Sequence, residues 1–219
     1  MGIKRREDSG AMNLSIIAGS LMQKVSEDHP DAVAREYEDK DDNKKTKWEI
    51  PYSSIDGVIT SIEFKDGDFG EQVIITLTDV DEVYKVYMPT DSRYFTDLAK
   101  KLPNVDLTRE VELFPYDFEG DNGKPVKGMS VKQEGEKVYS YYYDADKKET
   151  INGLPQPDDD WKTSYDKDDW KMFFIKERKF LKKAVQSVDF SSVVSKPRAK
   201  VSTSVPEEFE VDEGDDLPF

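Results

Sequence analysis

The stretch that decides the fold is residues 57–89, GVITSIEFKDGDFGEQVIITLTDVDEVYKVYMP. Apolar and polar residues alternate along it, it is rich in Val, Ile, Thr and Tyr, and two turn sequences interrupt it, DGDFG at 66–70 and DVDE at 79–82. Alternation interrupted by such turns is typical of antiparallel strands. The stretch therefore predicts a three-stranded meander over residues 57–65, 71–78 and 83–88, with Pro89 ending the third strand.

The same alternation predicts which side chains face the interior of the sheet, because successive residues of a strand point to opposite faces. A slip of one residue would exchange the two sets. Val73, Ile75 and Leu77 of the second strand and Tyr84, Val86 and Met88 of the third are expected to face inward, whereas Val83, Lys85 and Tyr87 are expected to face outward.

The residues after Pro89 predict a helix and then further strands. TDSRYFTDLAKKLPN (90–104) has a capping residue near its start, apolar residues on one side and a proline near its end. REVELFPYDFE and VKGMSVKQ predict a fourth and a fifth strand, and EKVYSYYYD predicts a sixth. Three strands, a helix and two strands is the element order of the OB-fold, a five-stranded partly open barrel. We therefore expect a mainly β (α+β) chain with flanking helices, built on one OB-fold-like barrel of five to six strands.

The flanks of this barrel divide the chain into four parts. Residues 1–46 form an N-terminal extension, in which Leu14, Ile17, Ala18, Leu21 and Val25 are spaced as in a short helix and residues 27–46 are a charged linker. Residues 47–144 are the OB-fold domain. Residues 145–190 hold a loop and an amphipathic basic helix over 166–188 that is expected to pack on the barrel. Residues 191–219 lack periodicity and are expected to be a disordered acidic tail.

The composition excludes several classes of chemistry. The chain has no cysteine and one histidine, His29, so disulfides, thiol nucleophiles, Cys-rich zinc sites and multi-histidine metal sites cannot be built from it. It contains no phosphate-binding glycine loop and no HExxH sequence. The acids Asp158, Asp159 and Asp160 can suit magnesium in a nuclease, but a solvated loop is the simpler interpretation. We therefore expect no enzyme activity, no cofactor and no metal, and, without an apolar stretch of about 20 residues, no membrane span.

The charge is unevenly distributed. The net charge is −15, which taken alone argues against nucleic acid as a ligand. Residues 207–219, however, hold seven acids and no base, whereas residues 170–185 hold six bases and one acid. The chain therefore combines a basic helix, a mixed body and an acidic tail.

Aromatic and basic residues lie where a platform for single-stranded nucleic acid needs them. Base stacking on aromatic rings tolerates any base sequence, and nearby cations meet phosphates. The alternative is that these rings form core and cross-strand pairs, as Tyr and Phe often do in strands. The candidate strand-binding residues are Trp48, Tyr52, Lys65, Phe69, Lys85, Tyr87, Arg93, Phe114, Tyr116, Lys127, Lys132, Tyr139 and Tyr141.

The last residues provide the most specific signal. A run of acids followed by Asp215, Asp216, Leu217, Pro218 and Phe219 resembles the C-terminal tip of the single-stranded DNA-binding protein (SSB) family, whose tails end in acids, Asp, an aliphatic residue, Pro and Phe. The flanking helices are not part of the bacterial pattern, so the chain looks most like a divergent bacteriophage SSB.

The resemblance implies a function. It implies a protein of the host bacterial cytoplasm that coats and protects single-stranded DNA in replication, recombination and repair without sequence preference. It also implies that the acidic tail competes with DNA, and that residues 215–219 recruit a replication or repair protein such as a polymerase, helicase, primase or nuclease. A different interpretation of the −15 charge is an acidic protein-binding module, a DNA mimic that does not bind DNA itself.

Overall fold

The computed structural model describes residues 10–39, 43–67, 70–80, 82–158, 164–191 and 193. Its elements are mostly strands, together with two α-helices and one short 3-10 helix, Leu102–Asn104. The strands are β1 Ala11–Ile17, β2 Ser20–Lys24, β3 Val33–Glu38, β4 Lys44–Tyr52, β5 Ile55–Gly67, β6 Gly70–Asp79, β7 Glu82–Pro89, β8 Val111–Glu119, β9 Pro125–Gln133, β10 Glu136–Lys137, β11 Tyr143–Asp144 and β12 Glu149–Thr150; the helices are α1 Arg93–Lys101 and α3 Lys167–Gln186.

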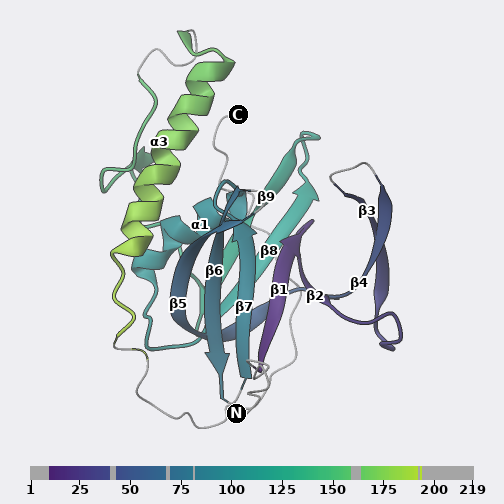
Figure 1. Ribbon diagram of the computed structural model, residues 1–219. Coiled ribbons are helices and arrows are strands. Elements are labelled where there is room, and N and C mark those ends of the chain that lie inside the picture. Colours follow the sequence, from purple (N-terminus) through teal and green to yellow (C-terminus); the bar gives the residue numbers. More distant parts are fainter. Residues whose placement is uncertain are drawn as a thin grey trace, which may run out of the picture.

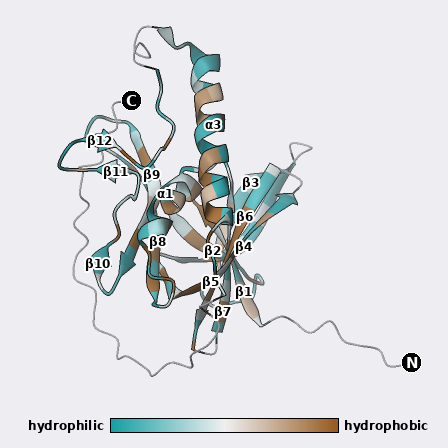
Figure 2. Cartoon of the chain, turned by 90° about the vertical axis from the view of Figure 1, so that its left-hand side faces the viewer, coloured by the Kyte–Doolittle hydropathy of each residue, from teal (hydrophilic) through white to brown (hydrophobic). Residues whose placement is uncertain are grey.

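The main sheet is open, so the predicted OB-fold barrel is wrong. Ten strands follow the order β10-β9-β8-β5-β6-β7-β1-β2-β4-β3, and β11 and β12 form a separate small sheet. A barrel closes only when its first and last strands pair, whereas here β10 and β3 lie at opposite edges (Figure 2). The sheet is mixed because β1 runs parallel to β7 while its other described pairs are antiparallel.

The central part of the sequence prediction is confirmed. The meander appears as β5, β6 and β7, and the fourth and fifth strands appear as β8 and β9. Helix α1 begins after Ser92, whose hydroxyl accepts a hydrogen bond from the backbone N–H of Phe95. Helix α3 begins with a capping box, in which the Asp166 side chain accepts from the backbone of Asp169 and the Asp169 side chain accepts from the backbone of Asp166.

The predicted N-terminal helix is wrong, because residues 11–24 form a β-hairpin. Ala18 and Gly19 make a two-residue turn with φ of 47° and 74°. Two positive φ values in succession match the right-handed twist of a hairpin. Leu14 of β1 and Leu21 of β2 are almost fully and fully buried in the same core. A hairpin therefore buries these two residues, seven positions apart, as well as one face of a helix would.

Two further boundaries need correction. The predicted charged linker contains β3 and the start of β4, whose polar side chains are tolerated because β3 is an edge strand. The predicted sixth strand is not continuous: its first two residues form β10 of the main sheet, and its last two, Tyr143–Asp144, form β11 of the small sheet. After β10 the chain turns away, and the backbone N–H of Tyr141 donates to the carbonyl of Lys100 on α1.

The core lies between the inner face of the curved sheet and α1, and α3 adds Leu181 and Val185 to it. The predicted inward set is confirmed for five of its residues, since Val73, Ile75, Leu77, Val86 and Met88 are at most 1% exposed. Tyr84 is only partly buried at the edge of this core. Phe64 of β5 meets Phe95 of α1 edge to face, with ring centroids 5.8 Å apart.

Helix α1 also caps the edge of β9 at a position that no strand covers. The carboxylate of Asp97 accepts from the backbone N–H of Met129 at 3.2 Å, and the ammonium of Lys101 donates to the Met129 carbonyl at 2.6 Å. Gly128 makes this approach possible, because a Cβ there would lie 1.9 Å from the Asp97 carboxylate. Side chains four residues apart on one helix thus replace a neighbouring strand.

Candidate nucleic-acid interface

Lys85 and Tyr87 lie on the outward face of β7. Cross-strand registers place Lys85 between Thr76 and Asn13, and Tyr87 is paired with Ile74 of β6. The Tyr87 hydroxyl donates to the Asn13 side chain at 3.0 Å, which shows that both side chains stand on the same face. The outward assignment made from the sequence is therefore confirmed for this strand.

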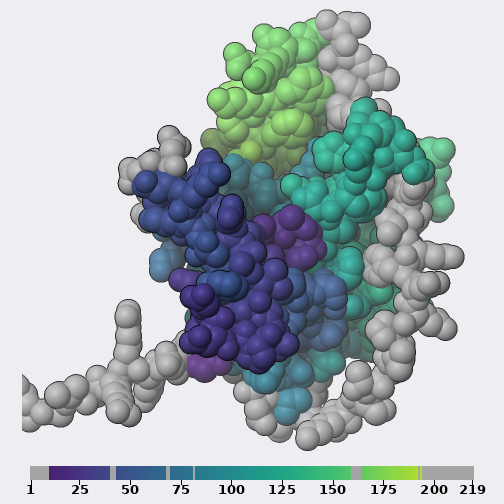
Figure 3. All heavy atoms as spheres, turned by 90° about the vertical axis from the view of Figure 1, so that its right-hand side faces the viewer, coloured from purple at the N-terminus to yellow at the C-terminus, as the bar shows by residue number. Residues whose placement is uncertain are grey.

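The same face continues across β1 and β2 onto the hairpin formed by β3 and β4. Here Tyr37 lies next to the cross-strand pair Arg35–Lys47, with the Lys47 Nζ 4.4 Å and the Arg35 Cζ 5.9 Å from its ring centroid. Both distances are in the range of cation–π attraction. The arrangement places an aromatic ring and two positive charges within a few ångströms of one another (Figure 3 shows this hairpin, in blue, on the surface).

Arg35 is held in place by Glu49, which is 4% exposed. Two guanidinium nitrogens donate to the two carboxylate oxygens at 2.6 and 3.1 Å. This hydrogen bonding raises the pKa of Arg35 above its usual value. Because a bidentate pair is rigid, the buried Glu49 orients Arg35 beside Tyr37.

We call this surface the outward basic face. The strand registers place Lys24 of β2 and Ser15 of β1 on the same side of the sheet as Glu49 and Tyr87. The face therefore extends from the Arg35–Glu49 pair to β7. The four strand spacings between β7 and β3 correspond to about 19 Å. Its cations are Lys24, Arg35, Lys45, Lys47, Lys65 and Lys85, and its carboxylates are Asp39, Glu49 and Glu63, of which Asp39 lies 2.5 Å from Lys45.

The charge on the outward side of the sheet becomes negative where β5 pairs with β8. Asp56 and Glu112 are direct cross-strand neighbours there. Burial, and then the negative charges of Glu112 and Glu110, raise the pKa of Asp56. The Lys132 ammonium lies 3.7 Å from Glu112. A polyanion is therefore disfavoured at β5–β8 and favoured toward β3.

Three of the predicted strand-binding aromatic residues contact other parts of the protein or lie on the opposite face of the sheet. Tyr116 donates to the Asp97 carboxylate at 3.1 Å and so helps to build the cap on β9. Tyr52 packs against the core and donates to Gln23 at 2.8 Å. Trp48 is paired with Ala34, so it lies on the opposite face of the hairpin from Tyr37.

The other predicted residues are dispersed over the molecule. Phe114 is partly buried opposite Ser130, Lys127 pairs with Asp117 at 2.9 Å, Arg93 is exposed at the start of α1, and Tyr139 and Tyr141 follow β10 at the far edge of the sheet. Of the twelve predicted residues that the structure describes, only Lys65, Lys85 and Tyr87 lie on the outward basic face. Phe69 and the predicted partner-binding residues 215–219 lie outside the described residues.

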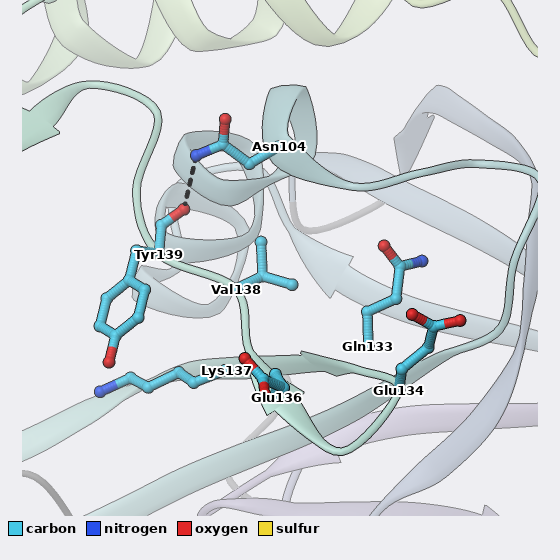
Figure 4. A pocket seen from close by; sticks show the side chains of 7 residues that line it. All are labelled: Asn104, Gln133, Glu134, Glu136, Lys137, Val138 and Tyr139. Atoms are coloured by element: carbon cyan, nitrogen blue, oxygen red, sulfur yellow. Dashed lines mark hydrogen bonds between the residues drawn. The ribbon is translucent and has the colours of Figure 1, made fainter.

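A polar hollow lies beside Tyr139, but its lining does not suit a nucleic acid (Figure 4). Glu134 and Glu136 line the hollow, and the Asn104 amide donates to the Tyr139 carbonyl at 3.0 Å. The ring of Tyr139 is 65% exposed, with the Lys137 ammonium 5.5 Å from its centroid. A ring with one cation beside two carboxylates is a poorer match for a polyanion than the Tyr37 cluster, by which we mean the ring of Tyr37 with Arg35 and Lys47.

Sequence reasoning missed Arg35 and Tyr37 because residues 27–46 were interpreted as a linker, and it did not select Lys47, the first residue of the predicted OB-fold domain. A signal was present, since VAREYE places Val, Arg and Tyr at alternate positions. That pattern places Arg35 and Tyr37 on one face of a strand.

Within the described ranges, no group of three or more His, Asp or Glu side chains is arranged to hold a metal ion. No helix among the same residues is long and apolar enough to cross a membrane. Comparison with family models, with curated proteins and with solved structures found no match for this chain.

Proposed function

We propose that this protein binds single-stranded DNA without sequence preference, and that the outward basic face is the surface that holds the strand. The observation that carries the proposal is the Tyr37 cluster, a ring beside Arg35 and Lys47. Bases stack on exposed rings and phosphates meet nearby cations, so this pairing of groups suits a strand of any sequence.

The acidic tail supports the same proposal from the sequence. The resemblance of residues 215–219 to the SSB tip suggests that they bind a replication or repair protein. The coating of strands and the recruitment of such proteins are then two activities of one chain, which use separate surfaces. The OB-fold is not required for this, because an open sheet can present rings and cations on one face.

Titration with oligo-dT, followed by intrinsic fluorescence at several salt concentrations, tests strand binding. The Tyr37→Ala variant should lose about 1–3 kcal/mol of binding free energy, roughly 5- to 150-fold in Kd. Lys47→Gln should lower the steepness of the salt dependence by about one ion. Tyr139→Ala is the matched control, because this exposed tyrosine lies beyond the opposite edge of the sheet, and its Kd should not change.

Two results would oppose the proposal. Absence of salt-sensitive binding to oligo-dT at low ionic strength would remove strand binding itself and favour the DNA-mimic interpretation of the −15 charge. Equal losses for Tyr37→Ala and Tyr139→Ala would keep strand binding but move it away from the outward basic face.

A further inference from the structure

Helix α3 exposes a stripe of cations on the side away from the core. Met172, Lys176, Lys179 and Lys183 follow one another at intervals of four, three and four residues, so they share one side of the helix. All four are exposed, Met172 by 64%, whereas Leu181 and Val185 on the other side are buried. The stripe is about 17 Å long.

These three lysines form no ion pair with any residue that the structure describes. Other charged groups of α3 differ in this respect, since Lys182 pairs with Glu71 and the Glu177 carboxylate lies 3.0 Å from Lys100. Figures 1 and 2 show the N-terminal half of α3, which carries Met172, standing clear of the sheet. The stripe is thus a surface that the body of the protein does not use.

We propose that residues 207–219 of the same chain dock on this stripe. Seven acids and no base in that segment complement three lysines that pair with no acid in the described ranges. The order of the groups also matches: a chain that leaves the C-terminal end of α3 and returns along it presents its acids first, to Lys183, Lys179 and Lys176. It presents Leu217 and Phe219 last, beside the exposed Met172.

The length of the intervening chain permits this contact. Residues 194–206 separate the last described residue, Val193, from Glu207, and thirteen residues span at most about 45 Å. The distance back along α3 from Gln186 to Met172 is about 21 Å. A short tether gives an effective concentration in the millimolar range, so a Kd of about 1 mM for the separate segments keeps the tail docked about half of the time.

Docking on α3 differs from competition between the tail and DNA. It leaves the outward basic face open and instead covers Leu217 and Phe219, the apolar residues proposed to bind a partner. The inference does not depend on strand binding, because it requires only the charges of α3 and of residues 207–219.

A nitroxide label on the full chain tests the contact. The chain has no cysteine, so Met172→Cys provides a single attachment site. In the labelled, isotopically enriched protein at low salt, the amide signals of Leu217 and Phe219 should lose at least half of their intensity. In 1 M salt, where the screening length falls to about 3 Å, they should recover. A matched label at Ser15→Cys, on the outward basic face, should leave these signals unchanged.

The charges are tested in the Met172→Cys background. Neutralising the stripe with Lys176→Gln, Lys179→Gln and Lys183→Gln should restore the tail signals at low salt, while Lys45→Gln with Lys47→Gln should not. Thermal melting checks that both variants stay folded. Broadening from Ser15→Cys in place of Met172→Cys would overturn the proposal in favour of competition at the DNA surface. Absence of broadening from either label, or broadening seen only between different copies of the chain, would also overturn it.

Discussion

Replacing Asp97 by alanine should destabilise the protein more than any loss of a surface charge. The carboxylate accepts from the backbone N–H of Met129 at 3.2 Å and from the Tyr116 hydroxyl at 3.1 Å. Burial raises the pKa of Asp97, and the charge of Lys101 is the largest opposing effect. Alanine leaves both donors without this acceptor and Lys101 without its compensating charge. A buried donor left unpaired costs about 1–3 kcal/mol, so we expect a loss of about 2–4 kcal/mol in the free energy of unfolding.

The assay is urea and thermal unfolding followed by circular dichroism. A domain of this size loses about 2–4 °C in Tm per kcal/mol, so Tm should fall by about 4–16 °C. Asp97→Asn should cost less than Asp97→Ala, because the amide oxygen still accepts a hydrogen bond. Asp117→Ala is the control: its ion pair with the exposed Lys127 should contribute at most about 1 kcal/mol. A loss for Asp97→Ala no larger than for Asp117→Ala would refute the edge-capping role of α1.

Three other substitutions test the hairpin turn and the partly buried Tyr84. Gly19→Ala places a Cβ 2.5 Å from the backbone nitrogen of Asp117 and should lower Tm, whereas Ala18→Gly should raise stability by up to about 1–2 kcal/mol, because it relieves a positive φ; opposite signs in thermal melts are the expected result. Burial, followed by the hydrogen bond to Glu82, raises the pKa of Tyr84 to about 12. The phenol ionises near pH 10 in the unfolded chain, so the free energy of unfolding should be highest below pH 10 and should fall as the pH rises toward 12. The Tyr84→Phe variant should lose less resistance to urea over that interval.

The sequence predicts elements that bury one face and expose the other. β6 is an example, because Val73, Ile75 and Leu77 occupy every second position and are completely buried, although Ile74 between the first two is also apolar. Helix α1 is predictable for the same reason, from its cap and its apolar side. These local patterns do not specify which strands pair over long distances. The barrel prediction failed at that step, because β7 pairs with β1, which lies more than 60 residues earlier in the chain.

The N-terminal error has a different physical origin. The spacing of Leu14, Ile17 and Leu21 fits one face of a helix, but Leu14 and Leu21 can also enter a core from the two strands of a hairpin. The choice between them depends on a turn in which Ala18 adopts a conformation that alanine rarely adopts. The β3–β4 hairpin was not predicted because solvent reaches both faces of β3, so the alternation of Val, Arg and Tyr with Ala and Glu does not separate apolar from polar residues.

The candidate site was predictable only in part, because aromatic residues in strands serve both cores and ligands. Tyr87 and Tyr116 look alike in the sequence, since each lies in an alternating strand. Tyr87 stands on the outward face, whereas Tyr116 holds Asp97 against the edge of β9. The difference follows from long-range contacts that only the assembled fold reveals: α1 brings Asp97 to the Tyr116 hydroxyl, whereas the acceptor for Tyr87 is Asn13 of β1.

The distribution of charge decides the direction in which a bound strand can extend. From Tyr87, a path toward β8 meets Asp56 and Glu112, whose proximity already raises the pKa of Asp56. A path toward β3 meets Lys24, Lys47 and Arg35, with Tyr37 available for stacking. The strand should therefore cross β1 and β2 and leave the sheet over the β3–β4 hairpin. Because β3 is the free edge of an open sheet, nothing among the described residues pairs with it and blocks that exit. A closed barrel would pair this edge, so the departure from the predicted fold creates the surface on which the proposed function depends.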